Sequence, residues 1–418
     1  MIRLFNIEIF RDFILEAKLL VALTLAYVFL FFYSNVLKAQ VDSLSDKDFK
    51  LDVSFYPLNN NFAKSGIKIK DGYIISGQNF FKKDTITNNS AVIKLSNEGV
   101  KLKELFSGND VSYRNPSTNK IIYGIDDNRL IQIGEKNKKK LWLRVLNTDL
   151  EILKDTVYKS IPIDVLSEPY FFEEKNGFYI VSNSSYYRDL EINITYFDKK
   201  TLKGKNDVIK FIEEPFNFFK LGGFTATHDV ENNLMYILLN GCPEREKNLC
   251  KEYKLYLIEY DLLNKKINNF KIIEEPNFND ARIIFHKNDL YLIGIKRLKE
   301  KLENNQTKNI TKFNVKVYST GFDKKREFEY GDDTFNQYMN HAIILNDKIY
   351  IGGYQYNNKI IKEESLFLTF DLEGKLLEKL LFSDEKKHSE NRITKIIPLE
   401  NDTFLLLGKG NGWRIIVK

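Results

Sequence analysis

The chain contains four histidines, His228, His286, His341 and His388. Histidine is a common metal ligand, and the spacing of three of these residues could suit a metal site. His286, His228 and His341 stand one, three and five positions before a short polar segment that predicts a turn. Side chains alternate across a strand with a period of two, so these three share a strand face. They belong to three neighbouring repeat units at three depths, whereas a metal ion needs its ligands about 2 Å away. We therefore expect hydrogen-bonded histidines and no metal site.

Carboxylates offer a second kind of chemistry. Glu168, Asp229 and Asp280 lie in or just before the strands that the repeat pattern places first in their units. A glycosidase or lyase needs an acid and a base, which makes an enzyme the alternative function. Ordinary polar lining explains the same residues equally well. The sequence contains no nucleophile elbow, zinc-binding helix motif, phosphate-binding glycine loop or calcium-loop spacing.

Basic and aromatic side chains indicate binding. Five positions before the predicted turns stand Tyr170, Arg282, His341 and Lys395, and three positions further back stand Tyr338 and Arg392. Arg282, His341, Arg392 and Lys395 belong to adjacent units, so their charge would focus on one side of a shared mouth and favour an anionic or hydroxyl-rich, carbohydrate-like ligand. The predicted ligand-binding residues are therefore Tyr170, Arg282, Tyr338, His341, Arg392 and Lys395. The alternative is a solvated rim paired with neighbours such as Asp280. We expect no cofactor.

The two cysteines, Cys242 and Cys250, are eight positions apart. In an oxidising compartment such a pair favours a local disulfide across residues 243–249 over two free thiols.

A repeat of about 55 residues must position these groups. Its mark is a polar turn between two apolar runs, and the turns begin at Lys70, Asp126, Lys175, Glu231, Lys287, Asn346 and Glu400. The spacings between them are 56, 49, 56, 56, 59 and 54 residues. Asn, Asp and Gly tolerate the positive φ angles of two-residue hairpin turns, so each turn can join two antiparallel strands.

Each unit contains four predicted strands. A β-branched and aromatic run such as Phe178–Val181 follows the turn, a third run such as Leu141–Val145 follows a loop, and a second turn such as Asp371–Gly374 leads to a more polar fourth strand. Four antiparallel strands per unit are typical of a β-propeller blade. The sequence therefore predicts an all-β, seven-bladed propeller over residues 40–418.

The last unit ends one strand short, at Trp413–Lys418. Residues 49–55 alternate apolar and polar side chains, as a strand with one buried face does. We expect residues 45–57 to pair beside Trp413–Lys418, complete the seventh blade and remove the exposed edges. The alternatives are six blades or an array of two-sheet sandwiches.

The first unit contains Gly72-Tyr-Ile-Ile-Ser-Gly77 in its second strand and Ile93-Lys-Leu-Ser-Asn-Glu-Gly99 from the third strand into its turn, and Phe367–Gly374 matches this pattern in part. With these residues the layout resembles exported bacterial propellers of uncharacterised family. The resemblance implies the propeller fold and carries no activity.

The N-terminal segment resembles an export signal. Residues 19–33 are uncharged and apolar and follow Arg3, Arg11 and Lys18. About fifteen residues fit a signal-peptide core better than a membrane span. Ala39 marks a cleavage position, so we expect residues 1–39 to be a signal peptide and the protein to be periplasmic, cell-surface or secreted. The alternative is an uncleaved membrane anchor at residues 19–33, which would be the only membrane contact.

Composition sets the last limits. The formal charge is +6, with lysine mixed among acidic residues, which disfavours a nucleic-acid partner.

We expect a binding or interaction module for a protein or an anionic, carbohydrate-like ligand, acting through the propeller face that carries the loops between second and third strands. These loops are predicted to be long at residues 80–90, 242–251, 296–312 and 355–364, and the opposite face is expected to hold little but short hairpins.

Overall fold

The computed structural model describes residues 49–51, 62–81, 87–97, 100–106, 121–136, 140–163, 169–184, 190–211, 216, 218, 220–246, 249–250, 252–273, 278–301, 307–331, 334–357, 362–382, 392–399, 403–409 and 413–416. The predicted signal segment, residues 1–39, lies outside them, as do Glu168 and His388. Within the described part of the chain, no helix is long and apolar enough to cross a membrane.

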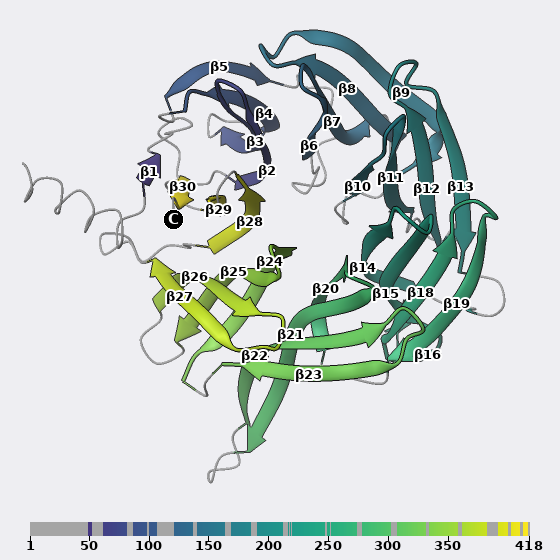
Figure 1. The fold of residues 1–418 in the computed structure, drawn as a ribbon, viewed down its shortest axis with the longest axis vertical. Helices are drawn as coiled ribbons and strands as arrows, with labels where there is room; N and C mark the ends of the chain where they lie inside the picture. Colours follow the sequence, from purple (N-terminus) through teal and green to yellow (C-terminus); the bar gives the residue numbers. More distant parts are fainter. Residues whose placement is uncertain are drawn as a thin grey trace, which may run out of the picture.

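The protein is an all-β propeller of four-stranded antiparallel blades around a common centre (Figure 1). Five blades are separate sheets. Their strands are β6 (Ile121–Asp126), β7 (Arg129–Lys136), β8 (Lys140–Asn147) and β9 (Ile152–Pro162); β10 (Tyr170–Glu173), β11 (Gly177–Ser184), β12 (Glu191–Asp198) and β13 (Gly204–Lys210); β14 (Lys220–Asp229), β15 (Leu234–Cys242), β18 (Lys254–Asp261) and β19 (Lys266–Ile273); β20 (Phe278–His286), β21 (Asp289–Lys301), β22 (Thr307–Ser319) and β23 (Lys324–Tyr330); and β24 (Asn336–Leu345), β25 (Lys348–Asn357), β26 (Lys362–Asp371) and β27 (Leu376–Phe382).

The first and last repeat units share one eight-stranded sheet. Its strands are β2 (Phe62–Ile69), β3 (Gly72–Phe81), β4 (Thr87–Leu95) and β5 (Lys101–Phe106), with β28 (Arg392–Pro398), β29 (Phe404–Lys409), β30 (Trp413–Ile416) and β1 (Phe49–Leu51). One residue pair, Phe62 with Lys409, joins the two sets. The described strands therefore form six blades, as in the alternative, and the expectation of seven separate blades is corrected by this pairing.

The strand at the N-terminal side pairs where the alternation of residues 49–55 placed it. Phe49, Lys50 and Leu51 lie antiparallel to Ile415, Arg414 and Trp413. The rest of the predicted closing segment, residues 45–48 and 52–57, lies outside the described residues.

Hairpin turns at one end of the strands define a turn face, and the connections between second and third strands, with those between blades, define the opposite loop face. The predicted turns take positive φ angles at Gly72, Asn233, Asn288 and Asp347. Three predicted long loops are wrong in part, because the strands continue through them. The pairing extends to Phe81 and Thr87 in β3 and β4, to Lys301 and Thr307 in β21 and β22, and to Asn357 and Lys362 in β25 and β26.

The apolar core lies between consecutive units, in seven clusters of the described residues. One cluster joins the two halves of the eight-stranded sheet through Tyr73, Ile75, Leu405 and Leu407. A small hairpin of β16 (Arg245–Glu246) and β17 (Leu249–Cys250) follows β15, with Cys242 at the end of β15 and Cys250 at the end of the hairpin.

Candidate functional site

A pocket of about 500 Å³ opens on the loop face, among the strand ends of β10, β14, β20 and β24. Its described lining includes five aromatic rings and four polar side chains, which are Tyr170, Phe224, Phe278, Tyr338 and Tyr354, and Asn240, Asp280, Arg282 and Asn340. The structure thus brings three of the six predicted residues, Tyr170, Arg282 and Tyr338, to one pocket.

β-Bulges shape the inner strands around this pocket. In β20, β24 and β28 the pairing register shifts immediately before Arg282, His341 and Lys395. A bulge bends its strand and re-aims the side chains beside it. Asp280, inside the first of these bulges, has a φ of 50°. A non-glycine residue held there costs about 1–3 kcal/mol, and such strain is concentrated at functional sites.

The bulged segments are linked from blade to blade by hydrogen bonds. Nη2 of Arg282 donates to the carbonyl oxygen of Asn340 at 2.8 Å. Nδ2 of Asn340 in turn donates to the carbonyl oxygen of Ile393 at 2.7 Å. Arg282 is half-buried. Its guanidinium holds the next blade through the bond to Asn340, and the residue also lines the pocket.

His341 lies below the pocket lining, in the wall between two blades. Its ring is buried, and Nδ1 accepts a hydrogen bond from the backbone N–H of Ile396 at 3.3 Å. Burial, helped by the nearby charges of Lys395 and Arg282, holds the pKa of His341 well below its usual value. The ring is therefore neutral and structural. Of the two cations, Arg282 lines the pocket, whereas Lys395 is not among its described lining residues.

An aromatic stack forms another wall of the pocket. The rings of Tyr338 and Tyr354 lie 4.7 Å apart at 10°, and the guanidinium of Arg392 lies 4.3 Å from the centre of the Tyr354 ring. Two hydrogen bonds, of 3.0 and 2.7 Å, tie Arg392 to Glu363. The pair raises the pKa of Arg392, whereas burial raises the pKa of Tyr354 and keeps its phenol protonated. Arg392 therefore supports Tyr354 from behind the pocket lining.

Sequence reasoning missed Tyr354 because it selected residues only from first strands. A signal was present: Gly352 and Gly353 precede Tyr354 in the second strand. A Cβ at position 353 would lie 1.9 Å from the carbonyl oxygen of Tyr338. Only glycine lets the two backbones come this close, with Tyr338 directly opposite Tyr354 in the register.

The other candidates do not join this pocket. His228 is packed between Phe172 and Tyr179, with Nε2 3.7 Å from a carboxylate oxygen of Glu174. His286 contacts Asp347 at 2.8 Å, and Asp229 accepts hydrogen bonds from Asn232 within its own turn. Among the described residues, no group of three His, Cys, Asp or Glu side chains could hold a metal ion.

No family model matches the chain, and no curated protein matches it. Solved structures similar to it include a member of the duf4221 family from Bacteroides vulgatus, with 13% identity, a TM-score of 0.36 and coverage of 73% of this chain and 90% of that chain. An apocarotenoid oxygenase mutant from Synechocystis has 7% identity, a TM-score of 0.38 and coverage of 78% and 95%. A GH43 endo-arabinanase from Bacillus licheniformis has 11% identity, a TM-score of 0.33 and coverage of 62% and 95%.

Proposed function

We propose that this protein is a binding module that takes an anionic, hydroxyl-rich ligand, of the acidic saccharide class, into the loop-face pocket. The observation that carries the proposal is the joint lining of one pocket by five aromatic rings and the Arg282 guanidinium. Ring faces provide flat apolar surface, and a guanidinium offers several N–H donors to a carboxylate.

Charge supports an anionic ligand. Arg282 lines the pocket, and Lys395 directly follows the corresponding bulge of β28. Asp280 is the only carboxylate among the described lining residues, and it is exposed at the rim with Arg297 3.8 Å away. An acidic group of the ligand can therefore reach Arg282, while the carboxylate of Asp280 lies near Arg297.

The test is isothermal titration of the full chain with trigalacturonate and with its neutral counterpart, galactotriose. We expect trigalacturonate to bind at least about tenfold more tightly, which corresponds to about 1.4 kcal/mol. Tyr338→Ala should weaken this binding by about tenfold, while Tyr253→Ala, an exposed tyrosine outside the pocket lining, should leave it unchanged. Absence of trigalacturonate binding, or equal binding of galactotriose, contradicts the proposal.

The enzyme alternative rests on Asp280, whose strained backbone lies at the pocket. A glycosidase uses two carboxylates that flank the scissile bond, and the described lining offers one. Release of reducing ends from trigalacturonate, lost in Asp280→Asn, would favour the enzyme over the binding module.

We further propose export through residues 1–39 and a disulfide between Cys242 and Cys250. Cys242 is buried at the end of β15, with its Sγ 3.0 Å from the carbonyl oxygen of Glu244. Cys250 ends the hairpin that begins three residues after Cys242. Mass spectrometry of the native N-terminus tests the first part, and thiol titration of the unreduced protein tests the second.

Finally, we propose that residues 45–57 close the ring at the eight-stranded sheet. The support is the pairing of β1 with β30 and the apolar cluster that joins the two halves of this sheet. Deleting residues 45–57 should lower the melting temperature far more than trimming a terminus does. An unchanged melting temperature in a monomeric variant contradicts this closure.

A further inference from the structure

The turn face carries a hollow larger than the loop-face pocket, where sequence reasoning expected little but short hairpins. It has a volume of about 1310 Å³ and lies among the first three repeat units. The turn at Lys70 and Asp71, the turn at Asp126–Asn128 and the turn at Thr148 and Asp149 contribute to its lining. Ligand pockets usually measure about 300–1,000 Å³, so this hollow has room for several sugar-sized rings.

Two stacked aromatic rings lie in the lining. Tyr123 of β6 and Phe171 of β10 are 4.4 Å apart at 10°, and both are half-buried. The hydroxyl of Tyr123 donates to the carbonyl oxygen of Pro169 at 3.4 Å, which fixes the plane of the ring. Phe171 also stacks on the buried ring of Phe178 at 5.2 Å, so the pair is rigid, and Tyr123 at its outer end provides the apolar surface of the hollow.

A buried lysine holds one side of the hollow. Nζ of Lys94 lies 2.9 Å from Asp71 and 2.8 Å from Asp149, and its side chain is only 8% exposed. The hydrogen bonds with both carboxylates raise the pKa of Lys94, and the bond with Lys94 lowers the pKa of Asp71. These three charges are fixed against one another across the first two units.

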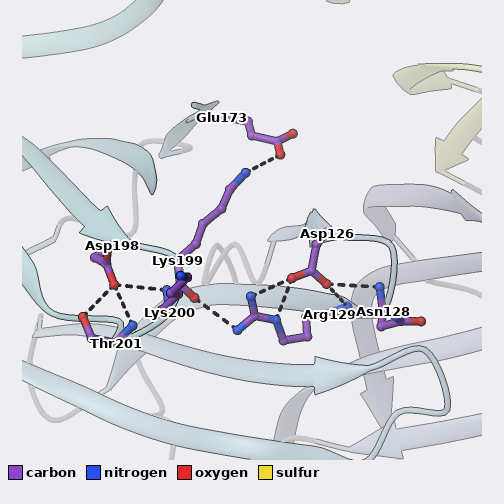
Figure 2. Close-up of polar contacts among 8 residues, drawn as sticks. All are labelled: Asp126, Asn128, Arg129, Glu173, Asp198, Lys199, Lys200 and Thr201. Carbon is purple, nitrogen blue, oxygen red and sulfur yellow. Dashed lines mark hydrogen bonds and ion pairs between the residues drawn. The ribbon is translucent and has the colours of Figure 1, made fainter. Parts of the chain in front are cut away.

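A second network holds the other side (Figure 2). Arg129 contacts Asp126 at 2.6 Å and donates to the carbonyl oxygen of Lys199 at 3.1 Å. Nζ of Lys199 reaches Glu173 at 2.7 Å. Figure 2 shows how these contacts run from the turn after β6 to the turn after β12. Asp126 and Glu173 line the hollow, so their carboxylates are also held in place.

The charges of the lining nearly balance. Five carboxylates and three ammonium groups line the hollow, and Arg129 and Lys199 neutralise two of the carboxylates from outside it. Within the described residues, Lys70 and Asp127 make no ion pair or hydrogen bond through their side chains, and both are exposed. A polyanion gains little here, whereas a hydroxyl group can accept from Lys70 and donate to Asp127 or to the spare lone pairs of the fixed carboxylates.

We infer that the turn-face hollow is a second ligand site, which binds an uncharged oligosaccharide against the Tyr123–Phe171 stack. Hydroxyl groups suit a lining in which fixed acceptors and donors alternate, and sugar rings suit the flat apolar surface. This site lies on the opposite face from the loop-face pocket, so it stands or falls independently of that pocket.

The experiment is isothermal titration of the full chain with a panel of neutral hexasaccharides, namely cellohexaose, xylohexaose and maltohexaose, and with hexagalacturonate. We expect at least one neutral hexasaccharide to bind, and hexagalacturonate to bind this face at least about tenfold more weakly. A Tyr338→Ala background, which weakens binding at the loop-face pocket, separates the two faces. Asp127→Ala and Tyr123→Leu should each weaken neutral binding about fivefold to tenfold, because each removes one partner of the ligand.

The matched control is Lys287→Ala, in the corresponding turn of another blade, which should leave neutral binding unchanged. Asp127 is exposed and outside both networks, so Asp127→Ala keeps the test valid even if Tyr123→Leu unfolds the protein. The inference is overturned if no neutral hexasaccharide binds, if binding is unaffected by Asp127→Ala, or if Tyr338→Ala alone abolishes it.

Discussion

The loop-face pocket and the turn-face hollow are built from the same repeat but differ in charge and in stiffness. Around the loop-face pocket, bulges distort the inner strands and leave Arg282 and Lys395 near one point. Around the turn-face hollow, regular hairpin turns bring carboxylates and cations together, and ion pairs fix most of them. The comparison teaches that bulges in the inner strands bring few charges and many rings to the loop-face pocket, whereas regular turns bring many paired charges to the turn-face hollow.

The largest expected effect concerns the close approach of two strands at the loop-face pocket. Gly353→Ala puts a Cβ 1.9 Å from the carbonyl oxygen of Tyr338, so the backbone must move. We expect the free energy of unfolding to fall by about 3 kcal/mol. We also expect the stacking of Tyr338 on Tyr354 to be lost. Gly223→Ala, at the same pocket, meets nothing within 4 Å and should change the stability by less than about 0.5 kcal/mol. Urea denaturation of both variants decides, and equal losses would show that the stack does not depend on this approach.

The next effect tests whether the turn face is held by its buried lysine. Lys94→Met removes the cation between Asp71 and Asp149, and both carboxylates can still reach water. We therefore expect a loss of only about 1–2 kcal/mol. Lys287→Met breaks an exposed ion pair with Asp347 and should cost less than about 0.5 kcal/mol. Thermal unfolding in low and high salt would contradict this account if the two variants lost the same stability.

The next prediction concerns how the stability depends on pH, because one buried histidine lies near each face. Burial lowers the pKa of His341 near the loop face and of His228 near the turn face, so each binds a proton more readily when unfolded. Their stabilising contribution is complete above the unfolded pKa of about 6.5 and is lost as the pH falls below it, by at most about 1.4 kcal/mol per pH unit for each histidine. Melting curves at pH 7.5, 6.5 and 5.5 measure the loss. His341→Asn should flatten the profile, and a profile unchanged by this variant would assign the effect elsewhere.

Sequence reasoning reached the repeat because its signals are local. Hairpin turns require residues that tolerate positive φ, and Gly72, Asn233 and Asp347 take such angles where predicted. The turns between third and fourth strands were harder to predict from the sequence. Leu150, Leu202 and Phe322 also have positive φ, although apolar residues are poor turn formers. All three side chains are buried, so tertiary packing offsets the local strain, which no local pattern reveals.

The candidate site was only partly predictable for the same reason. Counting five positions back from each turn found Arg282, His341 and Lys395, because those positions directly follow the bulges. Counting could not show that a bulge turns His341 into the wall and leaves Arg282 on the lining. It also could not find the hollow beside Tyr123, which depends on how three units sit against one another.

The smallest expected effect compares two arginines that each contact a carboxylate, Arg392 near the loop face and Arg129 near the turn face. Lysine keeps the charge of either residue but loses the planar, multidentate guanidinium. Arg392→Lys also loses the packing on Tyr354, whereas Arg129→Lys loses the bond to the carbonyl oxygen of Lys199. Both sites are partly exposed, so each change should cost less than about 1 kcal/mol in stability. We expect Arg392→Lys to weaken trigalacturonate binding by about threefold, since Tyr354 loses its support, and Arg129→Lys to leave that binding unchanged. Titration of both variants measures the difference. Equal weakening by the two lysines would mean that the faces are coupled and that the contrast between them is wrong.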